Sequence, residues 1–223
     1  MNKTYSHIII IVFLLLALRS QAQQVTQDAG LWSSLTIEKE FTKKISASLS
    51  EEFRFNENIT ELGSFFTDAG ITYKFNDDIK ISVCYRLISK KQLENYYSIR
   101  HRLYFDLALR KKIKKVTSGF RIRIQEQQAD IYSSDAGAIP EWYLRPKISM
   151  RYNMKGKWTP YLSSELFYHF GGKVFDNSRY TFGVERKITG NLDLDLFFLH
   201  QREMNVKNPT YDYIWGIGLN YSL

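Results

Sequence analysis

The sequence has few of the residues that stabilise small or cofactor-dependent proteins. Its single cysteine, Cys84, excludes a disulfide scaffold and a zinc site built from cysteines. With 4 prolines against 15 tyrosines and 15 phenylalanines, a disordered chain, which would be poor in aromatic residues, is also excluded. Only one long apolar run occurs, Ile8 to Leu18, and the mean hydropathy is -0.33, which excludes a bundle of transmembrane helices. A membrane β-barrel stays possible, because half of the side chains in its strands are polar.

The amino-terminal segment has the features of a secretory signal peptide. Lys3 precedes the apolar run, which is too short to cross a bilayer as a helix. The small residues Ser20 and Ala22 lie three positions and one position before a cleavage point. We therefore predict that residues 1–22 are removed and that residues 23–223 form a single domain. Removal takes away two basic residues and no acidic one, which lowers the net charge from +8 to +6.

The mature chain shows a period of two, which is typical of β-strands, and no sustained helical period. For example, Phe120, Ile122 and Ile124 alternate with Arg121 and Arg123. Eleven such segments occur, near residues 28–40, 45–55, 64–75, 79–88, 99–111, 116–127, 141–153, 159–170, 179–186, 191–203 and 211–223. Most of these segments are longer than a soluble strand, which has about five or six residues. They reach the length of a tilted membrane strand, which needs about nine to eleven residues.

These segments predict an all-β protein, a transmembrane up-and-down antiparallel β-barrel of about 10–12 strands. Bacterial barrels normally have an even strand count, so parity suggests twelve strands; a strand missing from the count would lie at the amino terminus, where residues 23–27 are short for it. Short polar turns alternate with longer loops along the chain, as in outer-membrane barrels. The alternative is a soluble sandwich or lipocalin-like barrel, in which the apolar face would be the core.

Aromatic residues lie at both ends of the expected strands, which predicts two belts at the membrane–water interfaces. One belt comprises Phe53, Phe55, Phe65, Tyr96, Tyr97, Tyr211 and Tyr213, and the other Phe41, Tyr73, Phe75, Tyr152 and Tyr221. The carboxyl terminus carries Gly218, Tyr221 and Leu223 at the spacing of the assembly signal of outer-membrane barrels. We therefore expect the barrel-assembly machinery and outer-membrane lipid as partners, and a monomer in the cell outer membrane.

Several stretches together resemble one family. They are Asp28–Leu35, Glu51–Arg54, Tyr97–Tyr104, Ile139–Arg145, Pro160–Tyr168 and Gln201–Val206. The chain is similar to domain-of-unknown-function family 2490, secreted proteins of Gram-negative bacteria regarded as outer-membrane barrels. The resemblance covers essentially all of the mature chain and implies a fold and a location. It implies no catalytic residue, because the family has no established activity.

With the apolar residues facing lipid, the polar register predicts a lumen with two charged walls. The predicted basic wall comprises Arg100, Arg102, Arg110, Arg121, Arg123, Arg145, Lys147 and Arg151. The predicted acidic wall comprises Glu52, Asp68, Glu165, Glu185, Asp193 and Asp195. Glu51 falls in the lipid-facing register, and a β-bulge would account for it.

Two functions follow from these walls. In the first, ion pairs plug a small barrel, which then acts as a structural or interaction protein. In the second, the basic wall draws anionic solutes through a narrow, anion-biased channel, since rings of arginine or lysine favour anions. We favour the first reading and keep the second as its alternative.

A third reading is an enzyme that modifies lipid in the outer leaflet. It would use a histidine with a serine and an acid. The mature histidines are His101, His169 and His200, and Ser98 and Ser178 are the nearby candidate nucleophiles. No local motif selects a nucleophile, so we predict no catalytic residues and no enzyme.

Other binding motifs are absent from the sequence. There is no glycine-rich phosphate loop, no metal-ligand spacing and no calcium loop, so we predict no metal and no cofactor. The arginines alternate with apolar residues and do not cluster on a soluble face, so we predict no nucleic acid partner.

Overall fold

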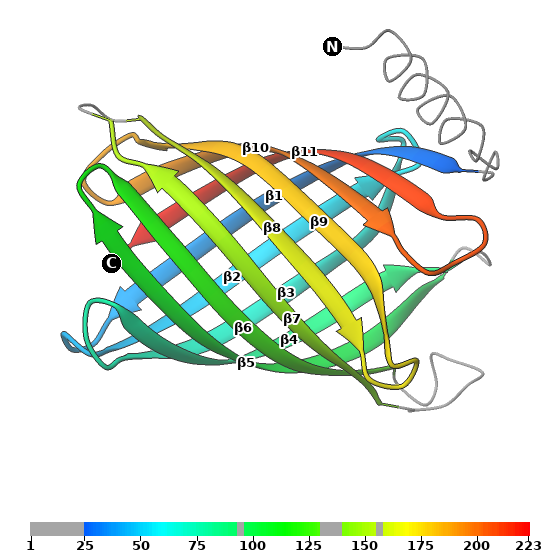
Figure 1. Ribbon diagram of the computed structural model, residues 1–223, viewed down its shortest axis with the longest axis horizontal. Coiled ribbons are helices and arrows are strands. Elements are labelled where there is room, and N and C mark those ends of the chain that lie inside the picture. Colours follow the sequence, from blue (N-terminus) through cyan, green and yellow to red (C-terminus); the bar gives the residue numbers. More distant parts are fainter. Residues whose placement is uncertain (1–24, 93–95, 130–139, 155–157) are drawn as a thin grey trace, which may run out of the picture.

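The computed structural model describes residues 25–92, 96–129, 140–154 and 158–223. The predicted signal peptide lies outside these residues. Eleven strands form one closed barrel (Figure 1). Their bounds are β1 Thr26–Glu40, β2 Ile45–Asn56, β3 Glu61–Lys74, β4 Ile79–Lys91, β5 Tyr97–Ile113, β6 Val116–Ala129, β7 Glu141–Tyr152, β8 Trp158–His169, β9 Val174–Lys187, β10 Leu192–Glu203 and β11 Thr210–Ser222. The described part of the chain contains no helix long and apolar enough to cross a membrane.

The barrel closes through a parallel pair. Each strand pairs antiparallel with its neighbours in sequence, whereas β1 and β11 run parallel, from Thr26 opposite Thr210 to Glu38 opposite Ser222. The all-β, up-and-down fold of about 10–12 strands is thus confirmed, and the described residues close it with eleven strands, not with the twelve that parity suggests. An odd number of strands can close a barrel because a parallel ladder forms backbone hydrogen bonds between the two free edges, as an antiparallel ladder does.

All connections at the end where β1 begins were expected to be long, and several are shorter than the sequence indicates. The alternating segments 159–170 and 179–186 leave a loop at 171–178 between them, but β9 begins at Val174, so most of this stretch is strand. The loop between β2 and β3 spans only residues 57–60, with left-handed backbone at Glu57, Asn58 and Ile59. The Asp28 carboxylate accepts hydrogen bonds from the backbone amides of Glu57 (3.1 Å) and Asn58 (2.8 Å). That carboxylate stabilises the turn, in which the left-handed backbone is unfavourable for the β-branched residue Ile59.

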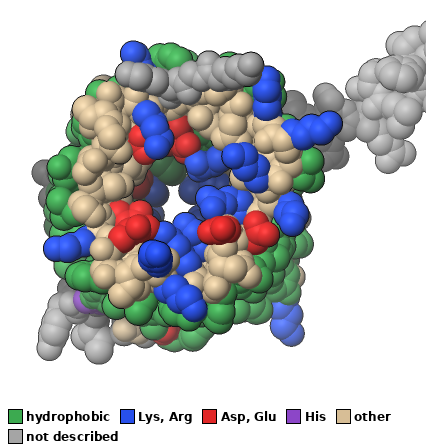
Figure 2. All heavy atoms as spheres, turned by 90° about the vertical axis from the view of Figure 1, so that its left-hand side faces the viewer, with side chains coloured by type: hydrophobic (Ala, Val, Ile, Leu, Met, Phe, Trp, Pro, Cys, Tyr) green, Lys and Arg blue, Asp and Glu red, His purple; other side chains and the backbone are tan. Residues whose placement is uncertain are grey.

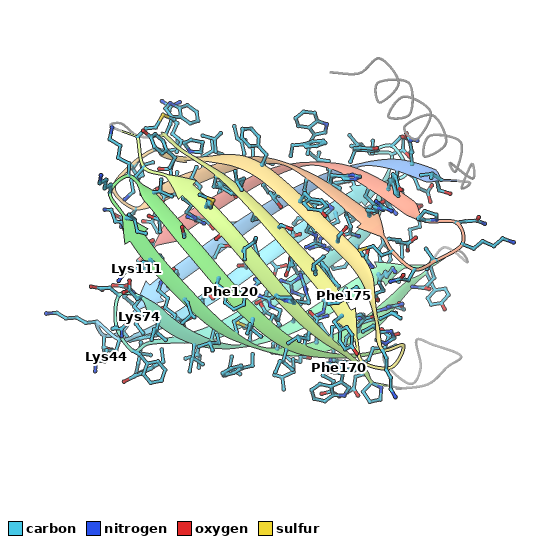
Figure 3. The ribbon with its side chains drawn as sticks, viewed as in Figure 1. Lys44, Lys74, Lys111, Phe120, Phe170 and Phe175 are labelled. Atoms are coloured by element: carbon cyan, nitrogen blue, oxygen red, sulfur yellow. The ribbon has the colours of Figure 1, made fainter. Side chains whose placement is uncertain are left out.

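The outer surface of the barrel is apolar. Side chains as large as Phe182 (65% exposed) and Ile71 (63% exposed) point away from the barrel. The short turns carry lysines such as Lys44, and Phe170 and Phe175 lie at the opposite end (Figure 3). This distribution is the reverse of a soluble barrel and is typical of a surface that contacts lipid.

Glu51 keeps the lipid-facing register, so the expected bulge at this position is wrong. β2 pairs regularly through Glu51 opposite Thr67, and its register shifts only between Arg54 and Phe55. The Thr67 hydroxyl donates a hydrogen bond of 2.6 Å to the Glu51 carboxylate. A neighbouring hydroxyl on the same face therefore compensates part of the cost of placing this polar group outside the lumen.

Candidate functional site in the lumen

The barrel contains two adjoining cavities. The first, of about 410 Å³, lies in the middle of the lumen, and the second, of about 580 Å³, opens at the short-turn end. Arg121 and Lys147 line both cavities and lie where the two meet. Seen from the short-turn end, the barrel is hollow at its centre, with Lys and Arg side chains along much of the wall (Figure 2).

Alternation along the strands directs seven arginines into the middle of the lumen. We call this set the arginine arc, because it extends from β2 to β9. Its members all line the central cavity and are Arg54, Arg86, Arg102, Arg121, Arg123, Arg145 and Arg179. Lys147 lines the same cavity, against the carboxylates of Glu52, Glu165 and Asp176. The positive charges on this wall outnumber the negative ones.

Glu165 on β8 is the centre of the ion-pair network. It is 3% exposed and accepts hydrogen bonds from Arg121 and from Arg145, whose Nη2 lies 3.0 Å away. Arg179 Nη1 lies 3.8 Å from the same carboxylate. Three guanidinium groups therefore share one carboxylate, which leaves this part of the wall positive.

Arg54, Arg86 and Arg123 of the arc are held by other carboxylates, whereas Arg102 is held by the Gln127 side chain. Asp106 accepts two 2.7 Å hydrogen bonds from Arg123, the bidentate geometry of a strong charged pair. Asp68 accepts from Arg86 Nε at 2.5 Å and from the Tyr104 hydroxyl at 2.8 and 2.7 Å. These contacts fix the guanidinium groups, so the positive wall has a defined geometry.

Aromatic rings support the guanidinium planes. Arg54 lies 3.7 Å from the ring centre of Trp32, and Arg145 lies 4.1 Å from that of Phe167. Arg123 stacks at 3.8 Å over Tyr104. Stacking on a ring occupies the faces of a guanidinium and leaves its N–H edges free to bind oxyanions.

The predicted wall residues divide between the middle of the lumen and its short-turn mouth. In the middle lie Arg102, Arg121, Arg123, Arg145, Lys147, Glu52, Asp68 and Glu165. At or toward the short-turn end lie Arg110, Arg151, Glu185, Asp193 and Asp195. Arg100 shares the lumen register on β5, and its Nε is buried with no hydrogen-bond partner among the described residues.

The charges interleave and do not form two separate facing walls. Arg145 meets Glu165 on the adjacent strand, and Arg151 Nη1 lies 2.7 Å from Glu185. Asp195 accepts hydrogen bonds from the Tyr161 hydroxyl, not from an arginine. Interleaving follows because opposite charges one or two strands apart come within reach, whereas the opposite wall lies across the cavity.

The predicted walls omitted four residues that shape the lumen. They are Arg54, Arg86, Arg179 and Asp106. Each lies in the polar register of its strand, so alternation alone would have placed it in the lumen. The residues of the predicted basic wall lie on three consecutive strands, β5 to β7, whereas the arginine arc extends from β2 to β9.

The strands that close the barrel contribute apolar residues to the middle of the lumen. We call Phe197 and Leu199 on β10 and Ile214 and Gly216 on β11, with the adjoining part of β1, the closing seam. Leu199 and Ile214 are each 4% exposed. A Cβ atom at Gly216 would lie 1.9 Å from Cζ of Phe197, so this ring lies directly on the glycine backbone.

In the described residues, His101, His169 and His200 have tyrosine partners and do not contact the candidate serines. His101 accepts or donates a 2.6 Å hydrogen bond with the Tyr85 hydroxyl, while Ser98 faces the opposite side of the same strand. His169 stacks on Tyr143, and His200 stacks on Tyr213. In the described ranges no hydrogen bond joins a histidine to Ser98 or Ser178. No cluster of three metal-ligating side chains occurs in that part of the chain.

Comparison with known proteins identifies a family and a fold. A family model described as "Protein of unknown function (DUF2490)" matches residues 29–212. Among solved structures, the NanC porin in a rhombohedral crystal form is similar, with a TM-score of 0.50 and 13% identity over 82% of this chain and 89% of its own. The anion-selective porin from Comamonas acidovorans reaches only a TM-score of 0.40, with 8% identity over 79% of this chain and 53% of its own. No curated protein matches the sequence. The first structural similarity shows a porin-like fold.

Proposed function

We propose that this chain, which belongs to the DUF2490 family of proteins of unknown function, is a narrow channel for small anionic solutes. The observation that carries the proposal is the surplus of cationic side chains along two adjoining cavities of the lumen. Fixed guanidinium groups in a confined space attract anions and repel cations. This reading replaces the plugged barrel as the favoured one, because the ion pairs narrow the lumen and leave a cavity of about 410 Å³.

We further propose that the protein spans the outer membrane. Its strands have 12 to 17 residues, enough for a tilted crossing of the hydrocarbon layer. The proposal includes cleavage after residue 22 and contact with outer-membrane lipid. It also includes insertion by the barrel-assembly machinery, for which Tyr221 and Leu223 offer exposed apolar groups at the carboxyl terminus. We expect each barrel to act as a monomer.

Electrical recordings in planar bilayers test the channel. In a potassium chloride gradient, the purified protein should give a reversal potential that indicates preference for chloride. The double variant Arg121→Gln, Arg145→Gln should lose most of this preference, because it removes two positive charges from the central cavity. Arg110→Gln removes one charge near the exposed mouth and serves as the control, with a small effect expected.

The converse variant is Glu165→Gln, which removes the carboxylate shared by three arginines and should increase the preference for chloride. Circular dichroism and the shift of folded barrels on unheated gels establish that each variant is folded. Conductance at background level for the folded wild type would refute the channel and leave the plugged, structural barrel. Preference for potassium would refute the proposed selectivity.

A further inference from the structure

Arg102 differs from every other member of the arginine arc in its partner. Arg54, Arg86 and Arg123 each bind a carboxylate, at 2.6, 2.5 and 2.7 Å. Arg121, Arg145 and Arg179 share the carboxylate of Glu165. Across the described ranges, no carboxylate oxygen lies within 4.0 Å of the Arg102 guanidinium.

The partner of Arg102 is a neutral amide. Its Nε donates to the Gln127 side-chain oxygen at 3.0 Å, and its Nη2 donates to the same atom. A glutamine thus occupies the place that a carboxylate holds beside other arginines of the arc. It orients the guanidinium and leaves its charge in place.

The surroundings make that charge costly. The positive charges of Arg54, Arg86 and Arg123 all repel that of Arg102. A cation in a confined lumen without a counter-ion is destabilised by its partial desolvation, and the binding of an anion reduces this cost. Arg102 and Gln127 both line the central cavity, so an anion from solution has space beside them.

We propose that Arg102 anchors a binding site for one oxyanion group, a carboxylate or a phosphate, carried by a small solute. The inference deepens the proposed channel function, since it names the group that the lumen binds as solute passes. A cavity of about 410 Å³ lies within the range of roughly 300 to 1,000 Å³ found for small-molecule sites. Gln127 occupies the Nε–Nη2 edge of the guanidinium, and the other edge, formed by Nη1 and Nη2, suits two parallel N–H···O bonds to an oxyanion.

Gln127→Glu is the decisive variant. The substitution changes an amide to a carboxylate of the same shape and gives Arg102 an internal counter-ion. The variant should fold at least as well as the wild type and yet bind oxyanions about tenfold more weakly or worse, because a charge-assisted hydrogen bond is lost. The matched control is Gln201→Glu, which adds the same charge beside Arg179, an arginine that already lies 3.8 Å from Glu165.

Binding is measured by isothermal titration of the full mature chain in detergent, with inorganic phosphate, acetate and glycine. Phosphate or acetate should bind the wild type and the Gln201→Glu variant, and the two arms identify the preferred oxyanion. Glycine, which is a zwitterion, should bind least. Equal weakening in the two variants would overturn the proposal, as would wild-type protein that binds neither anion.

The titration does not depend on conduction, so the two proposals fail separately. Binding without conductance would refute the channel and keep the Arg102 site. Chloride-selective conductance without binding of phosphate or acetate would refute the Arg102 site and keep the channel. Arg102→Gln provides the second variant and should weaken binding at least as much as Gln127→Glu does.

Discussion

The arginine arc and the closing seam line the same lumen, the arc with charged side chains and the seam with apolar ones. The arc holds buried charges such as Arg123 and Glu165, each met by a partner on another strand. The seam holds Leu199, Ile214 and a glycine covered by a phenylalanine ring. The arc is therefore stabilised by pairing and the seam by close packing, which predicts that the two regions respond differently to substitution.

The largest effect is expected in the arc, from Arg123→Ala. The substitution removes both hydrogen bonds to Asp106 and leaves that buried carboxylate with only Arg121, 3.9 Å away. Loss of one partner of a buried pair costs about 3–5 kcal/mol. Urea unfolding in detergent micelles, followed by circular dichroism, should show this loss in the free energy of unfolding.

Two controls limit the interpretation of that result. Arg151→Ala breaks an ion pair that is partly open to solvent, with the Arg151 side chain 47% exposed, and should cost about 0–1 kcal/mol. The double variant Arg123→Leu, Asp106→Leu should recover much of the stability, because no unpaired charge remains. Equal losses for Arg123→Ala and Arg151→Ala would contradict the view that pairing stabilises the arc.

The next effect is expected in the seam, from Gly216→Ala. The new methyl group would overlap the Phe197 ring, which must move in a packed region, at a cost of about 1–3 kcal/mol. Adding Phe197→Ala should relieve the overlap and restore part of the lost stability. Gly190→Ala is the control, because a Cβ there meets nothing within 4 Å. A Gly216→Ala variant as stable as Gly190→Ala would show that the seam tolerates expansion.

The alternation of side chains along each strand predicted part of the arginine arc, but it could not predict the closing seam. Because side chains alternate between the two faces of a strand, Arg121, Arg123 and Arg145 could be assigned to the lumen from local sequence. Their partners depend on which strands lie within reach, so the meeting of Arg121 on β6 with Glu165 on β8 was not visible. The contact between Phe197 and Gly216 likewise requires the register of β10 on β11.

The closure of the barrel shows the same limit. The eleven segments were readable as strands because each alternates over its own length. Their closure through parallel pairing of β1 with β11 is a property of the first and last strands together, so local alternation gave the count of eleven but not the way in which an odd number closes. The loops were overestimated for a related reason, since a residue such as Asp28 can hold a tight turn from a strand distant in sequence.

The smallest effect is expected where the two regions meet, from Trp32→Leu. Trp32 lies on β1, at the edge of the seam, and its ring faces Arg54 at 3.7 Å and Arg179 at 5.1 Å. Loss of these contacts should cost about 0.5–2 kcal/mol and weaken the preference for chloride by loosening two guanidinium groups. Trp215→Leu makes the same chemical change on the outer face, where the ring is 59% exposed, and should leave selectivity unchanged. If both variants shift the reversal potential equally, the effect belongs to the barrel as a whole and not to the junction of arc and seam.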